Sequence, residues 1–298
     1  MECSWKTVLL LVCASLGVQY TAIRTLRDSL SGPCQGAYRC QTRHHRVCLE
    51  GGDGAASDLP DESWCPKKCG ALNLTLASMS CLSKGHVAIK TVRVPEVGDL
   101  RTLTEDPRLD LKIIHLVRDP RAILASRMMA FSDQFRAWKI WNATGRQPRY
   151  VDLSQITSTC KDMAASAETG LQRPAWLRGR YLLVRYEDLA FNPKDRASEI
   201  YRFVGLEMED RVQMWIAKNT NSNVSSPSEW NYRYSTTRDS RATAESWRLR
   251  LGFDIVRTVQ NLCNDTLALL GYKQVHSAAE LRNLSHSLVE HRTFQPLT

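Results

Sequence analysis

The stretch LKIIHLVRDPRAILASR, residues 111–127, joins an apolar run to a charged turn and then to a helical pattern. The run 111–117 predicts a buried strand, and Asp119 followed by Pro120 predicts a helix that begins with a capping carboxylate and a proline. In open α/β sheets, ligands bind outside the carboxyl ends of the strands, and helix N-termini favour phosphate. The segment therefore predicts a phosphate-binding turn.

Two side chains of this segment suit a phosphate. Arg118 directly follows the strand and offers a guanidinium fork for bidentate contact. Ser126 lies about two helical turns further on and projects toward the side of the helix start. The alternative is structural: Arg118 pairs with Asp119 within the turn, and Ser126 is a small residue that allows helix packing. The residues by themselves leave both interpretations open.

Short apolar runs alternate with helical patterns from about His86 onward. The runs 86–92 and 181–186 predict two further buried strands. Further helices are expected from Asp152 toward Gly170, from Pro193 with Ile200, Phe203 and Val204 on one face, and from near Thr243 to Gly271. This order is typical of an α/β domain with a largely parallel sheet and a helical C-terminal section.

The composition is that of a globular protein of 298 residues, with 43% hydrophobic and 24% charged residues. Forty lysines and arginines against 31 acidic residues give a net charge of +9. A basic balance suits a polyanionic partner, such as a nucleic acid, a phosphorylated nucleotide, an anionic membrane or an acidic glycan. Composition excludes disordered, acidic and low-complexity classes and does not choose among these partners.

The uncharged run from Thr7 to Ile23 predicts a membrane anchor, because as a helix it would be about 26 Å long. A cleaved signal peptide is the alternative, since Ser15 and Gly17 are small residues suited to a cleavage site. The arginines that follow the run would place the rest of the chain in the cytosol by the positive-inside rule.

Sequons and cysteines favour the lumen instead. The chain has five Asn-x-Ser/Thr sequons, and eight of its ten cysteines follow the apolar run. The cysteines lack zinc-finger spacing, so disulfides are expected rather than a metal site. The predicted organisation is a cytoplasmic tail over 1–6, a transmembrane signal anchor over 7–23, a stem over 24–64 and a lumenal domain over 65–298.

Four sequence blocks resemble sulfotransferases that use 3′-phosphoadenosine 5′-phosphosulfate as sulfonate donor. VRDPRAILAS (117–126) is similar to their 3′-phosphate-binding segment, and the other blocks follow in family order: AIKTVRVPE (88–96), VRYEDLAFNP (184–193) and TAESWR (243–248). Residues 1–30 and about 64–298 look closest to the galactose/N-acetylglucosamine/N-acetylgalactosamine 6-O-sulfotransferase family. The resemblance implies a P-loop-like sulfotransferase fold.

The resemblance also implies a donor site. Its cofactor-binding residues would be Arg118, Asp119, Pro120, Arg121, Ser126, Arg238, Trp247 and Arg248, with the last three in a segment that covers the nucleotide. For Trp247, a place in the core of the last long helix is the alternative. Arg185, Glu187 and Asp188 of the YEDL block are expected to form an ion-pair set that shapes the site.

One departure from the family concerns the 5′-phosphosulfate loop. Family members carry an Arg-Ser/Thr-Gly-Ser-Ser sequence after the first strand, and this chain has none. We therefore expect the first strand and its loop to be missing and the sheet to have a gap or an unpaired edge. Without those donors the chain should fold poorly and transfer no detectable sulfonate until a loop-bearing segment is restored after Gln35.

The reaction implied by the resemblance is transfer of sulfonate to the 6-hydroxyl of galactose or N-acetylglucosamine in keratan-sulfate-type glycans. Lys90 is the candidate cation for the bridging oxygen. Cytosolic sulfotransferases have a histidine two positions after the matching lysine, and Val92 stands there, so no base is assigned. The implied setting is a single-pass type II Golgi membrane protein, with no metal, no nucleic-acid partner and the oligomeric state open.

Aromatic and basic side chains of the middle segment could form an acceptor groove for a sulfated glycan. Aromatic faces stack on sugars and arginines meet sulfates, which suggests Trp138, Trp141 and Trp176 with Arg136, Arg146 and Arg149. A second function stays open beside the enzyme: a catalytically inactive, membrane-tethered protein that binds glycan or a partner enzyme. The missing loop is the feature that separates the two.

Overall fold

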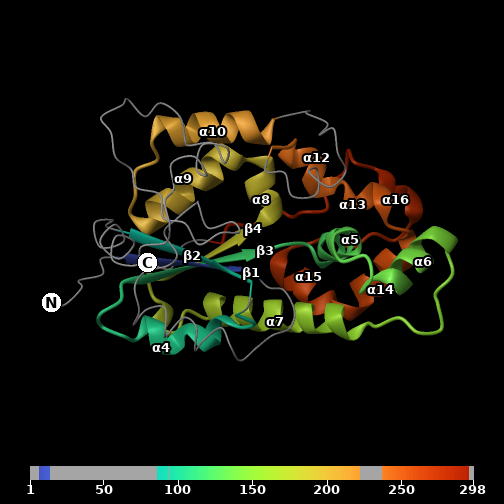
Figure 1. Ribbon diagram of the computed structural model, residues 1–298, viewed down its shortest axis with the longest axis horizontal. Coiled ribbons are helices and arrows are strands. Elements are labelled where there is room, and N and C mark those ends of the chain that lie inside the picture. Colours follow the sequence, from blue (N-terminus) through green and yellow to red (C-terminus); the bar gives the residue numbers. More distant parts are fainter. Residues whose placement is uncertain (1–6, 14–85, 93, 222–236, 295–298) are drawn as a thin grey trace, which may run out of the picture.

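A parallel sheet of four strands lies at the centre of the computed structural model, which describes residues 7–13, 86–92, 94–221 and 237–294 (Figure 1). The strand order is β2-β1-β3-β4, and the strands span Thr7–Cys13 (β1), His86–Thr91 (β2), Leu111–Val117 (β3) and Tyr181–Arg185 (β4). The three strands predicted from the apolar runs are present, with β2 and β4 each one residue shorter. The expected burial is confirmed for β3 and β4 and is wrong for β2, where only Val87 is buried.

The position between β2 and β3 is filled by Thr7–Cys13, which corrects the expectation of a missing first strand. Its backbone pairs in parallel with both neighbours, with Leu11 opposite Lys90 on one side and Ile114 on the other. This is also the start of the run assigned to a membrane anchor. A continuous apolar run meets the needs of a central parallel strand as well as those of a membrane span. Residues 14–85, with the rest of that run and the predicted stem, lie outside the described part of the chain.

Helices cover both faces of the sheet (Figure 1). One face carries η1 (Val97–Leu100), α4 (Arg101–Thr104) and α7 (Ser154–Leu171), and the other carries α8 (Tyr186–Phe191), α9 (Pro193–Val204) and α10 (Asp210–Thr220). Alternate residues of β3 face opposite ways: Ile113 belongs to the main core, and Ile114 packs with Phe203 and Val204 of α9. Two buried faces explain why β3 and β4 are apolar runs rather than alternating patterns.

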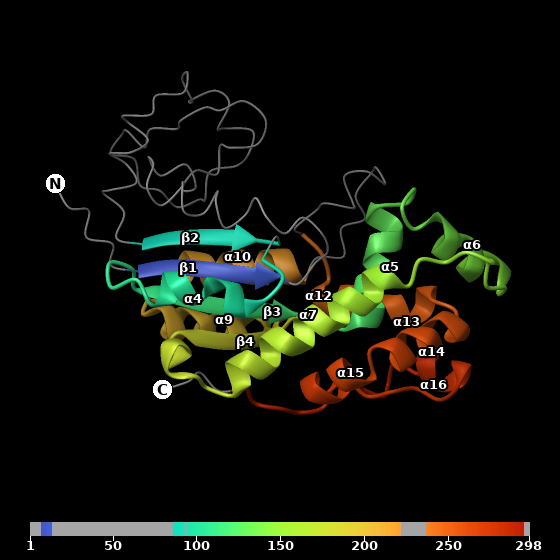
Figure 2. The ribbon, with the colours of Figure 1, turned by 90° about the horizontal axis from the view of Figure 1, so that it is seen from below.

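A group of helices stands beyond the carboxyl ends of the strands (Figure 2). It contains α5 (Pro120–Ala130) and α6 (Arg136–Thr144), together with α12 (Ser240–Glu245), α13 (Trp247–Arg250), α14 (Phe253–Leu262), α15 (Asn264–Leu270) and α16 (Ala278–Arg282). The short helix η2 (Ala175–Leu177) precedes β4. Asp119 caps α5 as predicted, because its carboxylate accepts from the Arg121 amide at 2.9 Å.

The single helix predicted from Thr243 to Gly271 is wrong, because the chain breaks it into α12 to α15. At the main break, Leu251 and Gly252 are extended. The side-chain amide of Asn142 stabilises this break: its Nδ2 donates to the Arg250 carbonyl at 2.9 Å, and its Oδ1 accepts from the Gly252 amide at 2.8 Å. The predicted end is confirmed, since Gly271 is left-handed and caps α15.

Gly170 allows α7 to lie against β4. A Cβ at this position would be 2.1 Å from the Tyr181 ring, so only glycine permits the contact. The Tyr181 hydroxyl is in turn 2.8 Å from Nδ1 of His115, which is fully buried in β3. Burial lowers the pKa of His115 to about 4, so the imidazole is neutral at pH 7. The contact between Gly170 and Tyr181 thus fixes the position of α7 on its face of the sheet.

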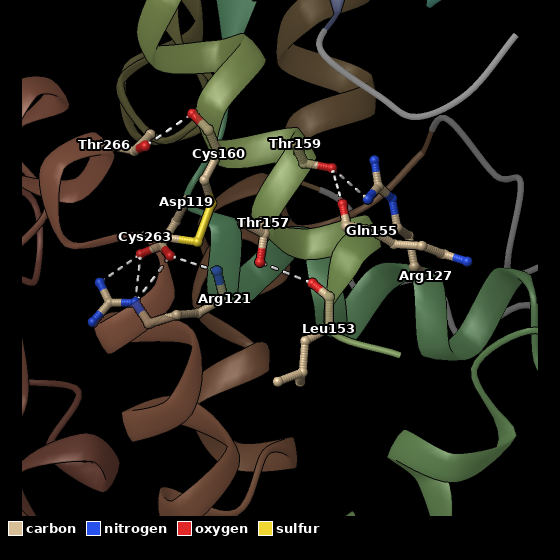
Figure 3. The surroundings of a disulfide bond; sticks show 10 residues. All are labelled: Asp119, Arg121, Arg127, Leu153, Gln155, Thr157, Thr159, Cys160, Cys263 and Thr266. Carbon is tan, nitrogen blue, oxygen red and sulfur yellow. Dashed lines mark hydrogen bonds and ion pairs between the residues drawn. A yellow bond between two sulfur atoms is a disulfide. The ribbon is translucent and has the colours of Figure 1, made fainter. Parts of the chain in front are cut away.

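One predicted disulfide lies in the described residues. Cys160 of α7 is bonded to Cys263, which follows α14, and both side chains are buried in the main core (Figure 3). Thr266 of α15 donates to the Cys160 carbonyl at 2.9 Å beside the disulfide.

Among the described helices, none is long and apolar enough to cross a bilayer.

Candidate functional site

The strand order places a topological switch point between β1 and β3. From β1 the chain moves to β2 on one side of the sheet, and then crosses to β3 and β4 on the other. Ligands of open parallel sheets bind outside the carboxyl ends of the strands at such a point. Arg118 and the N-terminus of α5 stand there, directly after Val117. The fold therefore puts the predicted phosphate-binding turn where this architecture holds ligands.

Arg118 has no carboxylate partner in the turn. Its guanidinium carbon lies 4.3 Å from the centre of the Tyr186 ring, a cation–π contact. Its Nε is buried and has no hydrogen-bond partner among the described residues. The structural alternative, an ion pair of Arg118 with Asp119, is wrong, because Asp119 pairs with Arg121 instead. Tyr186 thus holds the guanidinium from one side and leaves it able to receive an anion.

The Asp119–Arg121 pair is a buried structural element. The carboxylate receives bonds from the Arg121 Nε at 2.9 Å and Nη2 at 2.7 Å, and the two side chains are 3% and 0% exposed. Arg121 Nη1 donates to Gln260 and to the Lys273 carbonyl, and the guanidinium lies over the Trp247 ring. All three guanidinium nitrogens therefore donate to protein acceptors, so Arg121 anchors the turn to the helices at the C-terminal end of the chain.

Glu187 supports the same turn from α8, the helix that follows β4. Its carboxylate accepts from the Asp119 amide at 3.1 Å and from the Tyr272 hydroxyl at 2.7 Å. Burial, reinforced by the nearby Asp119 carboxylate, raises the pKa of Glu187 to about 7. Sequence reasoning expected Glu187 in an ion-pair set, and the structure gives it hydrogen bonds instead. The ion-pair expectation is confirmed for Arg185 and Asp188, which are 2.8 Å apart.

Glu187 predicts a pH dependence of stability. Because its pKa of about 7 in the folded state lies above the ordinary 4.5, the folded state binds this proton more tightly than the unfolded state. The contribution is complete below pH 4.5 and is lost as the pH rises to 7. Relative to Glu187→Gln, which does not titrate, the free energy of unfolding should fall by about 3 kcal/mol over this range.

Denaturant unfolding of both proteins at a series of pH values between 4.5 and 7.5 measures this difference. His115 is present in both proteins, so its opposite contribution cancels. A difference that stays constant with pH would show that folding does not raise the pKa of Glu187.

The other donor-site and catalytic candidates fall into different places. Ser126 is exposed on α5, as a ligand-binding hydroxyl must be. Lys90 is exposed on β2. In the sheet it is level with Ile114 of β3, because both residues lie opposite Leu11 of β1. Ile114 comes four residues before Arg118, which is about 13 Å along the strand direction. The structure therefore does not bring Lys90 beside Arg118; it lies further back along the sheet.

The predicted nucleotide-covering segment is largely core. Trp247 is 3% exposed and belongs to the main hydrophobic cluster, which favours the core interpretation. Arg248 is 1% exposed; it pairs with Glu245 at 2.9 Å and donates to backbone carbonyls of 280–286. Arg238 is partly exposed and already has interactions within the protein.

A pocket of about 480 Å³ lies where α6 meets the N-terminal end of α7. Of the predicted acceptor residues it includes Trp138 and Arg149, and its wall also contains Tyr150 and Gln155. Trp141 stacks on Trp138 at 5.5 Å inside the core and does not line it. The remaining predicted acceptor residues, Arg136, Arg146 and Trp176, also lie outside its lining. Of the six side chains predicted to form an acceptor groove, only Trp138 and Arg149 therefore line this pocket.

Sequence reasoning missed several contributors: Tyr186, Tyr272, Gln260 and the Arg127–Thr159 pair. Tyr186 had a local signal, because it follows the strand 181–185 as Arg118 follows 111–117. Tyr272 and Gln260 had none, since Glu187 and Arg121, with which they bond at this site, lie more than eighty residues away. Within the described ranges no cluster of metal-ligating side chains is present.

The sulfotransferase domain model matches residues 56–271, so the chain belongs to the sulfotransferase domain family. Carbohydrate sulfotransferase 1 of Rattus norvegicus is 53% identical over 243 residues, which are 82% of this chain and 58% of that protein. Carbohydrate sulfotransferase 3 of Tetronarce californica is 44% identical over 274 residues, covering 92% and 58%.

The chain spans about three fifths of the length of these curated relatives. Among solved structures, the sulfotransferase domain of the Synechococcus PCC 7002 olefin synthase aligns with a TM-score of 0.39 and 19% identity, covering 86% of this chain and 94% of that chain. The predicted family and fold class, an α/β sulfotransferase fold with a parallel sheet, are confirmed by the family match and the sheet.

Proposed function

We propose that this chain is a carbohydrate sulfotransferase unit that takes its sulfonate from 3′-phosphoadenosine 5′-phosphosulfate. The acceptor is the 6-hydroxyl of galactose, or of N-acetylglucosamine, in a keratan-sulfate-type glycan. Membership of the sulfotransferase family and the names of the carbohydrate-specific relatives support the class of reaction. The sequence blocks that resemble 6-O-sulfotransferases support the acceptor.

The open guanidinium of Arg118 is the observation that carries the donor site. A half-buried arginine at the switch point, stacked on Tyr186 and in no ion pair with a described residue, is suited to the 3′-phosphate of the nucleotide. The N-terminus of α5 adds its dipole, and Ser126 adds a hydroxyl. Asp119, Arg121 and Glu187 act indirectly by holding this turn in place.

Transfer requires a cation near the bridging oxygen and a base for the acceptor hydroxyl. Lys90, one residue before the end of β2, is our candidate for the cation. The pocket between α6 and α7, with Arg149 and Trp138 in its wall, is our candidate for part of the acceptor site. We further propose the Golgi membrane as the location, with the domain in the lumen and the glycan as its partner.

The sequence also favours a second candidate: a non-catalytic sulfotransferase-like protein that binds glycan or a partner enzyme. The chain contains no Arg-Ser/Thr-Gly-Ser-Ser sequence, which in the resembling enzymes holds the 5′-phosphosulfate. Loss of one such donor typically costs about 2.7–4 kcal/mol of transition-state stabilisation, so loss of the whole loop would nearly abolish turnover. Nucleotide binding at Arg118 would remain.

A labelled-donor assay on a keratan-type oligosaccharide separates the two candidates. The 298-residue chain, called the printed chain because its sequence is printed above, is compared with one that carries a loop-bearing segment after Gln35. An acceptor with 6-deoxygalactose, which lacks the 6-hydroxyl of galactose, is the control. Label on the ordinary acceptor from the printed chain supports the enzyme. Label from the loop-bearing chain alone supports the non-catalytic candidate for the printed chain. No label from either, with both folded, would contradict the proposed reaction.

A further inference from the structure

Four arginine side chains are buried in the described part of the chain, and one of them differs from the rest. Arg121, Arg185 and Arg248 each pair with a carboxylate no more than 2.9 Å away and also donate to backbone carbonyls. Arg127 is 7% exposed and forms no ion pair with a carboxylate in the described part of the chain. An unpaired buried charge costs several kcal/mol in general, so its presence calls for a counter-charge.

The contacts of Arg127 hold only one side of its guanidinium. Nη1 donates to Thr159 Oγ1 at 2.9 Å, and that hydroxyl donates onward to the Gln155 carbonyl at 2.7 Å. Nη2 is buried and has no hydrogen-bond partner in the part of the chain that the structure describes. Figure 3 shows the guanidinium of Arg127 bonded to Thr159, whose hydroxyl is bonded in turn to Gln155.

Arg127 also stands in the region of the candidate donor and acceptor sites. It lies on α5, the helix that begins beside Arg118, and it directly follows the exposed Ser126. Through Thr159 it connects to Gln155, which lines the pocket between α6 and α7. Burial lowers its pKa to about 10, so the side chain remains a cation at pH 7.

We propose that Arg127 binds an oxyanion of the phosphate or sulfate class through Nη2, as a positioning cation between the donor turn and the α6–α7 pocket. The planar fork of arginine matches such oxyanions, and a bound oxyanion supplies the counter-charge that the described residues do not. Two molecules could carry this oxyanion to the site: the nucleotide donor and a sulfated glycan acceptor. The choice of these two molecules rests on the proposed function, whereas the binding of an oxyanion does not.

Arg127→Met tests this inference, because methionine fills similar space without a charge. Binding is measured by calorimetry with inorganic sulfate at constant ionic strength, adenosine 3′,5′-bisphosphate and a galactose 6-sulfate disaccharide. Sulfate binding should weaken about ten- to a hundredfold, the effect of losing a charge-assisted hydrogen bond. A loss with the nucleotide alone identifies the donor as carrier, and a loss with the disaccharide alone identifies the acceptor.

Stability of the ligand-free protein gives the second readout. Replacing a buried ion that has no partner by an apolar side chain is neutral or stabilising, so Arg127→Met should keep or raise the unfolding midpoint. Thr159 keeps the Gln155 carbonyl as its acceptor, so no donor is orphaned. Arg185→Met is the matched control and should lower the midpoint, because it leaves Asp188 without its partner.

The inference is overturned if Arg127→Met binds all three probes like the wild type, if the wild type binds none of them, or if the midpoint falls as far as in Arg185→Met. Arg127→Lys, which keeps the charge and loses the fork, should recover part of the sulfate affinity. If sulfate binding depends on Arg127 while neither chain of the transfer assay labels the glycan, the proposed function fails and this inference stands.

Discussion

Arg121→Ala should lower the free energy of unfolding by about 3–5 kcal/mol, because it leaves the Asp119 carboxylate buried without its counter-charge. The pair is almost fully enclosed, and Arg121 also joins α5 to Gln260 of α14 and to the Lys273 carbonyl. Its loss therefore removes a charge partner and two long-range hydrogen bonds together. Denaturant unfolding of the variant and the wild type at pH 7 measures the effect.

The chain contains a matched control for this prediction. Arg108 pairs with Asp106 at 2.7 Å, with the same spacing and distance as Arg121 with Asp119, but the Arg108 side chain is 82% exposed. Arg108→Ala should have a far smaller effect, since water screens an exposed pair. Equal losses for Arg121→Ala and Arg108→Ala would contradict the structural role. If Arg121→Ala does not fold, Arg121→Lys should show an intermediate loss.

Removing the disulfide between Cys160 and Cys263 should have an effect of similar size. The two cysteines are 103 residues apart, and closing a loop of about 100 residues restricts the unfolded chain by up to about 4.7 kcal/mol. A double Cys→Ala variant should accordingly lose about 2–5 kcal/mol in denaturant unfolding under oxidising conditions.

The reduced wild-type protein is the control that separates the cross-link from packing. It keeps both sulfur atoms in the core, and the double variant is measured under the same reducing conditions, so that the other cysteines are in the same state in both proteins. Reduced wild type and double variant should therefore lie close together, and both well below the oxidised wild type. An oxidised wild type no more stable than its reduced form would show that the bond does not restrain this domain.

Local patterns were sufficient for the elements that position the site. The strand 111–117 and the helix begun by Asp119 and Pro120 were predicted with correct starts, because a turn and a cap mark them within a few residues. The break at Gly252 was missed because Asn142, more than a hundred residues away, supplies its hydrogen bonds. Likewise, sequence does not tell which arginine pairs with Asp119, since Arg118 and Arg121 flank it equally well.

The run 7–13 shows a different limit of sequence patterns. A short apolar stretch fits a buried strand, a membrane span and a signal peptide, and periodicity does not separate them. In the structure its backbone completes the sheet between β2 and β3. That pairing depends on two strands that lie more than seventy residues further along the chain. The donor turn, by contrast, needs only the segment 117–126 for its prediction.

The central claim is that Arg118, at the carboxyl end of β3, binds the 3′-phosphate of the donor nucleotide. Calorimetric titration with adenosine 3′,5′-bisphosphate and with adenosine 5′-monophosphate, which lacks that phosphate, tests it in the wild type and in Arg118→Ala. We predict that the bisphosphate binds more tightly to the wild type and that Arg118→Ala weakens it about ten- to a hundredfold, with little change for the monophosphate. Equal affinities of the two nucleotides for the wild type, or an undiminished affinity of the folded variant for the bisphosphate, would contradict the claim.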